Sequence, residues 1–166
     1  MSQTTSWCHT DTALATKPAV IQPDSLNFSK DFSKRETKAD SAVIVNTTSP
    51  LDRQETVKFS WSKIGNVYSN TGIDQSAYSP NKTGVSALMQ LNTILSVTDS
   101  VTSKRVDLPI SAHIVLKVPN HEVIDSAILE SVATRLVALM YEESGTDAGT
   151  RLNSLVRGAC LPKALA

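Results

Sequence analysis

The stretch that decides the fold is Val106–Gly158, which reads VDLPISAHIVLKVPNHEVIDSAILESVATRLVALMYEESGTDAGTRLNSLVRG. Its first part has apolar side chains at every second position from Leu108 to Val118 and mostly polar ones between them. This period of two indicates a strand with one dry face and one mostly polar face, because successive side chains point to opposite sides of a sheet. Pro119 lacks the N–H that a ladder hydrogen bond needs, so the strand is predicted to end there.

A long amphipathic helix is predicted to follow over residues 126–141. Asp125 is the preferred N-cap and Asn120 the other candidate, because both side chains accept hydrogen bonds from a helix start. On a helical wheel the apolar side chains fill an arc of roughly 180°, whereas a surface helix needs only about 100°. The surplus predicts a second burial partner, which is either another subunit or the domain's own core. A polar loop and a second helix over residues 150–157 follow, and Gly158 suits the position after its end.

The region before this stretch predicts strands. Residues 26–32 and 42–45, around a charged turn region at 30–40, predict an N-terminal hairpin, and residues 54–64 and 85–97 predict two longer strands. The polar loop over 65–84, with its glycines and prolines, is of the length that carries function or lies on an outer surface.

The expected fold class is therefore α+β: an N-terminal hairpin, an antiparallel sheet, then two C-terminal helices. One domain is predicted over residues 26–166, with strands within 26–118 and helices within 125–158. Residues 1–25 are rich in Ser, Thr, Gln and Pro and predict an extended or disordered arm. The arm is either a floppy tail or a segment that packs along a neighbouring subunit.

Composition limits the classes of partner. The chain has 166 residues, with 16 basic and 16 acidic side chains and a net charge of zero. That balance argues against a broad basic surface for nucleic acid, although a local polar face is compatible with it. No apolar run reaches the roughly 18 residues of a membrane span, so no membrane partner is expected. The first residues lack a secretory pattern, which favours a protein made and kept in the cytosol.

The sequence predicts no enzyme and no cofactor. The 3 histidines have no metal-ligand spacing with Cys or carboxylates, and no phosphate-binding glycine loop or nucleophile motif is present. Asp52, Arg53 and Glu55 are interpreted as a solvated charge group. Cys8 and Cys160 are either free thiols in a reducing compartment or a cross-link between subunits.

One face of the predicted sheet has an unusual composition. Opposite the apolar side chains of the three long strands lie hydroxyls, amides, two lysines and a histidine, without a carboxylate. Hydroxyls and amides can read base edges, lysines neutralise phosphates, and a histidine ring can stack on an unpaired base. The alternative is an ordinary solvated sheet face. The candidate RNA-binding residues, called the polar face below, are Thr56, Lys58, Ser60, Ser62, Ser86, Gln90, Asn92, Ser111, His113 and Lys117.

The order strand, proline, long helix, loop and short helix resembles the C-terminal half of the coat proteins of single-stranded RNA bacteriophages of the levivirus type. The residues that carry the resemblance are Leu108–Pro119, Ile124–Leu139 and Leu152–Gly158, the last reading LNSLVRG. Family members start much closer to their first strand, so the N-terminal arm is a departure. The resemblance implies a major capsid protein that dimerises and assembles into an icosahedral shell in the cytoplasm of a bacterial host, and that is then part of the virion.

The resemblance also implies roles for particular residues. Two subunits would pair sheet edge to sheet edge in an intertwined dimer, with the helices of each over the sheet of the other. The polar face would grip a genomic RNA hairpin for packaging and for repression of replicase translation, with Ser111 and His113 at base-contacting positions. Some members have a stacking tyrosine where this chain has Ser111. The implied dimer-interface residues are Ile128, Val132, Leu136, Leu139, Met140, Leu152 and Leu155. The implied symmetry-axis loop consists of Asp99, Ser100, Val101, Thr102, Ser103 and Lys104.

Two other functions fit parts of the pattern. A small dimeric RNA-binding regulator would share the polar face and the dimer but would form no shell. An interaction module such as an adhesion subunit would use neither RNA nor a shell, and the lack of a signal sequence counts against it.

Overall fold

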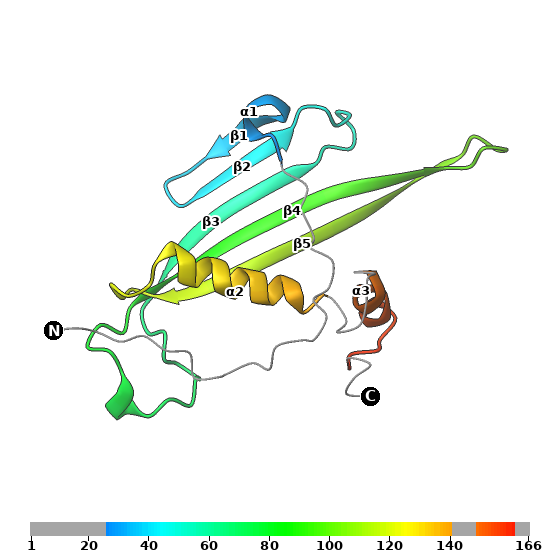
Figure 1. The fold of residues 1–166 in the computed structure, drawn as a ribbon. Coiled ribbons are helices and arrows are strands. Elements are labelled where there is room, and N and C mark those ends of the chain that lie inside the picture. The colour runs from blue at the N-terminus through cyan, green and yellow to red at the C-terminus, as the bar shows by residue number, and fades with distance from the viewer. Residues whose placement is uncertain (1–25, 141–148, 162–166) are drawn as a thin grey trace. The chain divides into compact units, whose positions relative to one another are not determined.

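The structure is a computed structural model that describes residues 26–140 and 149–161. The described residues form two compact units, 26–121 and the C-terminal residues from Glu122 onward. The first unit is an antiparallel sheet with strands β1 (Phe32–Thr37), β2 (Ser41–Asn46), β3 (Thr56–Ile64), β4 (Gly84–Thr98) and β5 (Arg105–Pro119). Their spatial order follows the chain order, as Figure 1 shows. The second unit contains the helices α2 (Ser126–Ala138) and α3 (Gly149–Val156). The predicted α+β fold class is confirmed.

The N-terminal hairpin is present, but its first strand lies later than predicted. Residues 28–31, expected to be extended, form the helical turn α1 (Phe28–Asp31), and β1 occupies part of the expected turn region. The reason is local: the Asn27 side chain accepts a hydrogen bond from the Lys30 N–H at 3.2 Å and caps the turn. The hairpin also pairs with β3, from Ala42 opposite Phe59 to Val45 opposite Thr56, so it extends the main sheet.

The strand register confirms the predicted alternation. Residues directly opposite each other in an antiparallel pair share a face, so each row of partners can be assigned to one side. One row runs from Phe59 through Met89 to Ile114, and the next row on the same side runs from Val57 through Leu91 to Ala112. We call this side the apolar face. The rows between them belong to the polar face.

The core within the described chain is small. Val45 and Val57 are the buried apolar side chains, at 8% and 7% exposure. The rings of Phe28, Phe32 and Phe59 pack together, with centroid separations of 5.3 Å from Phe28 to Phe32 and 6.3 Å from Phe28 to Phe59. Many large side chains of the apolar face remain exposed by more than a third: Phe59, Trp61, Val85, Met89, Leu91, Leu95, Val97, Val106, Leu108 and Ile110.

The long helix begins where the sequence predicted. Asp125 is the N-cap, and its carboxylate accepts a hydrogen bond from the Ile128 N–H at 2.9 Å. Asn120, the other candidate, instead continues the sheet ladder, with its N–H bonded to the Thr83 carbonyl at 2.9 Å. The helix ends at Ala138, before the predicted 141.

Gly158 follows α3 with φ of 90°, the left-handed conformation that ends helices. Among the described residues, no helix is long and apolar enough to cross a membrane.

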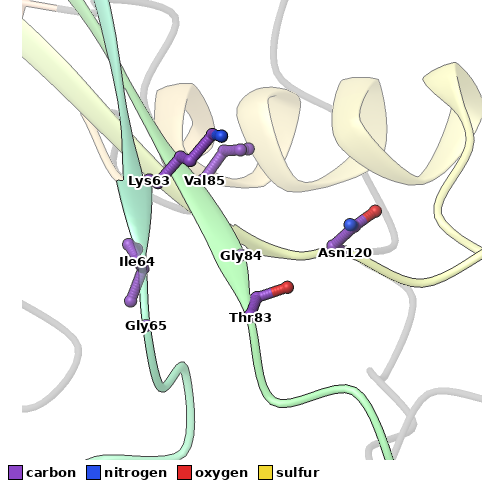
Figure 2. A pocket seen from close by; sticks show the side chains of 7 residues that line it. All are labelled: Lys63, Ile64, Gly65, Thr83, Gly84, Val85 and Asn120. Carbon is purple, nitrogen blue, oxygen red and sulfur yellow. The ribbon is translucent and has the colours of Figure 1, made fainter.

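Gly84 is required where β4 starts, between β3 and β5 (Figure 2). A Cβ built there would overlap the Val67 side chain and lie 2.5 Å from the Val118 carbonyl oxygen. We expect Gly84→Ala to destabilise the protein by about 1–3 kcal/mol, because the sheet would have to shift around the methyl group. Urea denaturation of the two proteins at equal concentration measures the difference.

Gly65→Ala is the matched control, because a Cβ there would meet no atom within 4 Å. Equal unfolding midpoints for the Gly84 and Gly65 variants would contradict the steric argument.

Candidate nucleic-acid interface

The register brings all ten predicted polar-face residues onto one side of β3, β4 and β5. Three rows of opposite residues contain most of them: Thr56–Asn92–Ser111, Lys58–Gln90–His113 and Ser62–Ser86–Lys117. Between the second and third rows lies Ser60–Leu88–Val115, which is largely apolar. The alternation in the sequence therefore predicted on which side of the sheet each residue lies. Strand pairing decides which of these residues are neighbours.

Asn92 is the centre of a hydrogen-bonded cluster on this face. Its carbonyl oxygen accepts from the Ser111 hydroxyl at 2.8 Å and from the Gln90 amide at 3.1 Å. Its own amide donates to the Thr56 hydroxyl at 3.5 Å. These bonds orient amides and hydroxyls from three strands, the groups that recognise base edges by hydrogen bonding.

His113 lies in the row next to this cluster, opposite Gln90, with Lys58 on the far side of Gln90. The imidazole is exposed, which a ring needs in order to stack on an unpaired base. Lys58 is half-buried, whereas Lys117, at the end of the face where β5 stops, is exposed. An aromatic platform and cations therefore flank a hydrogen-bonding centre.

An ionic network that the sequence analysis missed lies on the same face toward the tip of the β4–β5 ribbon. Arg53 donates to the Ser96 hydroxyl at 2.8 Å, and Ser96 donates to Asp107 at 2.7 Å. Arg105 contacts both Asp107 and Asp52 at 3.1 Å. Arg53 is therefore more than part of a solvated charge group, since its side chain reaches a strand. Strand register was needed to find this network.

The network also acts on the Asp52 carboxyl group. Partial desolvation raises the pKa of Asp52, but hydrogen bonds from Arg53, from its own backbone and from Arg105 together hold that pKa below its usual range. Asp52 is thus ionised at neutral pH and balances the arginines beside it. The network carries both signs of charge, so it limits how far a purely cationic surface extends along the face.

The predicted dimer-interface residues of the helices are largely exposed to solvent. Val132, Leu136 and Leu139 of the α2 region are exposed, at 41%, 38% and 58% respectively. Leu152 and Leu155 of α3 are exposed as well, and Ile128 and Met140 are half-buried. No residue of α2 is buried. These side chains are available for an interface, whose existence stays a prediction at this point.

The loop at Asp99–Lys104 caps a ribbon of two strands. Beyond the pair Thr56–Asn92, β4 and β5 pair only with each other among the described residues, and Figure 1 shows them extending past the other strands. The Asp99 carboxylate accepts from the N–H groups of Val101 at 2.7 Å and Thr102 at 2.9 Å. Ser103 has φ of 55°, the left-handed conformation that lets the turn close.

This turn should respond to acid. Backbone hydrogen bonds from Thr102 and Val101 lower the pKa of Asp99 from the ordinary 3.8. A depressed carboxyl pKa stabilises the turn above the unfolded value, and the effect is lost as the pH falls through the folded value. We therefore expect the amide proton shifts of Val101 and Thr102 to titrate with a midpoint below 3.8, measured by NMR. A midpoint at or above 3.8 would contradict the capping role.

In the described part of the chain, no three His, Cys, Asp or Glu side chains gather as a metal site requires. Cys160 is an exposed free thiol. Cys8 and the N-terminal arm lie outside the described residues, so the cross-link between subunits stays a prediction.

Comparison with solved structures gives close matches. The protein of the virus-like particle of bacteriophage AVE015 has a TM-score of 0.81 and 28% sequence identity, over 90% of this chain and 93% of that chain. The virus-like particle of bacteriophage GQ-112 matches with a TM-score of 0.77 and 15% identity, over 95% of this chain and 98% of that chain. The virus-like particle of Beihai levi-like virus 32 matches with a TM-score of 0.51 and 14% identity, over 81% and 92%.

No protein-family model and no curated protein matches the sequence. The two weaker structural matches show the fold, and the AVE015 match adds sequence similarity over nearly the whole of both chains. The similar proteins are components of virus-like particles. The resemblance inferred from the sequence is therefore confirmed: this chain has the fold of the coat proteins of levi-like RNA bacteriophages.

Proposed function

We propose that the chain is the major capsid protein of a single-stranded RNA phage, and that it dimerises and assembles into an icosahedral shell. The observation that carries the proposal is the match to the AVE015 virus-like particle over nine-tenths of both chains. The protein would be assembled in the cytoplasm of the bacterial host and become part of the virion. The polar face would line the interior and bind a genomic RNA hairpin that overlaps the replicase start, for packaging and translational repression.

The exposed apolar surface supports self-association. Monomeric proteins rarely expose contiguous apolar patches larger than a few hundred Å², and larger ones mark interaction sites. Here apolar side chains are exposed along the apolar face of β3, β4 and β5, and along α2 and α3. An obligate dimer typically buries more than about 2,000 Å². We therefore infer that a second copy covers these surfaces and that the folded monomer is not a stable species.

The edge of β5 supports a specific mode of pairing. β5 is the last strand of the sheet, and among the described residues it pairs with β4 alone. The N–H of Asn120 bonds to the Thr83 carbonyl, and the Lys104 carbonyl accepts from the Asp99 N–H. Even-numbered residues of β5 therefore direct their backbone N–H and C=O groups toward β4. Odd-numbered residues of β5 direct theirs toward the open edge of the sheet. Pro109, which has no N–H, occupies an outward position, as proline does on edge strands.

The outward donors of this edge are at Ser111, His113, Val115 and Lys117, a continuous run without proline. A twofold-related copy of β5 would complete their hydrogen bonds in an isologous contact. The polar face would then continue from one subunit to the next. In each subunit, β5 with His113 would be the strand next to the twofold axis. A hairpin could contact both subunits across this joint surface.

RNA binding rests on the composition and connectivity of the polar face. The face offers an exposed imidazole, lysines, and amides held by the Asn92 cluster. Such groups bind unpaired bases and phosphates. The zero net charge of the whole chain means that this local face, and not a general basic surface, would select the RNA.

Negative-stain electron microscopy of the protein expressed alone in bacteria tests the proposal, with absorbance at 260 and 280 nm on the same fraction. Uniform round particles containing nucleic acid are the expected result. A soluble dimer that binds RNA but forms no particles would overturn the capsid proposal in favour of a small RNA-binding regulator. Particles without nucleic acid would retain the shell and remove the RNA-binding role.

A further inference from the structure

We infer that the loop over residues 65–83 and the end of the polar face form a pocket for an unpaired nucleotide of the packaged RNA. The inference rests on the proposed RNA-binding function and adds a second site to it. The cavity has a volume of about 540 Å³. Its floor includes Ser86 and Lys117, which share the last fully polar row of the polar face, and Ile64 and Pro119 of the next row.

Contacts within the loop stabilise its conformation. The rings of Tyr68 and Tyr78 stack at 4.1 Å with 13° between their planes, and the Lys82 ammonium lies 5.3 Å from the Tyr78 centroid. The Ser79 N–H donates to the Tyr68 hydroxyl at 2.9 Å. At its base, the Val67 N–H donates to the Lys82 carbonyl at 2.9 Å. A site built on such a loop loses little entropy on binding.

The lining of the cavity matches the parts of a nucleotide. Ile64, Val67, Ile73 and Pro119 supply apolar wall, and Tyr68 supplies an aromatic ring that can contact a base. Amides and hydroxyls come from Asn66, Ser69, Asn70, Thr71 and Ser86, and the charged residue among the lining is Lys117. An apolar wall with hydrogen-bonding groups and one cation fits a base and its phosphate, and the lining contains no carboxylate that would repel them.

Continuity with the polar face identifies the occupant as RNA. Ser86 and Lys117 belong both to the polar face and to the cavity, so a strand lying across the face reaches the pocket without leaving protein surface. A base held there would be splayed out of any duplex, the state in which proteins read single-stranded RNA.

Ultraviolet cross-linking of the purified RNA-containing particles, followed by ribonuclease, trypsin and mass spectrometry, tests the pocket. Trypsin cleaves after Lys63 and Lys82, so the pocket loop is released as one peptide that contains Tyr68. It also cleaves after Arg105 and Lys117, which separates the β5 part of the polar face. Nucleotide adducts on the 64–82 peptide are the expected result.

The outcomes separate the two proposals. Adducts on the 106–117 peptide without any on 64–82 would overturn the pocket and leave the RNA-binding face intact. Particles that carry no RNA would remove the RNA-binding proposal and the pocket with it.

A substitution within the pocket tests whether the adducts form there. Asn70 lines the cavity and has φ of 62°, which Asn and Asp both tolerate. Asn70→Asp places a negative charge in the pocket, and we expect the adduct yield on 64–82, relative to that on 106–117, to fall about tenfold or more. Gln75→Glu is the matched control, because it makes the same change in the same loop outside the lining. An equal effect in both variants, or none in Asn70→Asp, would overturn the pocket.

Discussion

Replacing Leu136 by Asp is expected to abolish the soluble dimer and every particle that depends on it. Leu136 lies on α2 and is 38% exposed in the single chain, among apolar neighbours such as Val132 and Leu139 that are exposed too. In the proposed dimer this side chain is covered by the second copy. A carboxylate buried there without a partner would cost several kcal/mol, which is comparable with the whole stability of a small domain.

Thr134→Asp is the matched control for this substitution. It introduces the same carboxylate into the same helix, on the polar arc, where a charge stays in water. We expect Thr134→Asp to assemble normally and Leu136→Asp to be insoluble or unfolded by ultracentrifugation and circular dichroism. A folded monomer of Leu136→Asp would contradict the obligate dimer, and a normal dimer would contradict the assigned interface.

Removing the His113 ring is expected to give the largest loss of RNA affinity from a single change on the polar face. His113 is the exposed ring beside the Asn92 cluster, and stacking of a base on such a ring contributes about 1–3 kcal/mol. His113→Ala should therefore weaken hairpin binding by about 5- to 150-fold at fixed salt. The fold should be unaffected, because the side chain points away from the apolar face.

Lys58→Ala provides the electrostatic comparison. Loss of one phosphate contact should weaken binding of all sequences equally and reduce the slope of log affinity against log salt by about 0.7–0.9. His113→Ala should leave that slope unchanged. His121→Ala, a histidine outside the strands, serves as the control for the substitution itself. Unchanged RNA content and hairpin affinity in both polar-face variants would refute the assigned face.

Much of the fold was predictable because its signals are local. The alternation from Leu108 to Val118 placed β5 and both of its faces, since side-chain direction in a strand depends only on parity. The Asp125 cap fixed the start of α2 in the same way. The first strand was misplaced because Asn27 caps a helical turn at Phe28–Asp31, and this local bond outweighed a weak strand pattern.

The sequence predicted which residues belong to the candidate site but not how they are arranged in space. Each polar-face residue could be assigned to its side of the sheet from its odd or even position in its own strand. Their grouping into a cluster around Asn92 depends on pairing between residues such as Thr56 and Asn92, which are far apart in the chain. The bond from Arg53 to Ser96 and the position of the 65–83 loop depend on the same pairing, and no local pattern marks them.

The sequence by itself therefore determined the long strands β3, β4 and β5 and the two C-terminal helices, which way their side chains point, and that more apolar surface is present than one small chain can bury. Propensity, capping and period act over a few residues, and they can be read without a partner strand. Only the tertiary structure decided which residues are neighbours across strands, where the long loop folds back, and which backbone edge stays open. Those features depend on strand register, which is set by the summed packing and hydrogen bonding of whole strands and not by any one segment.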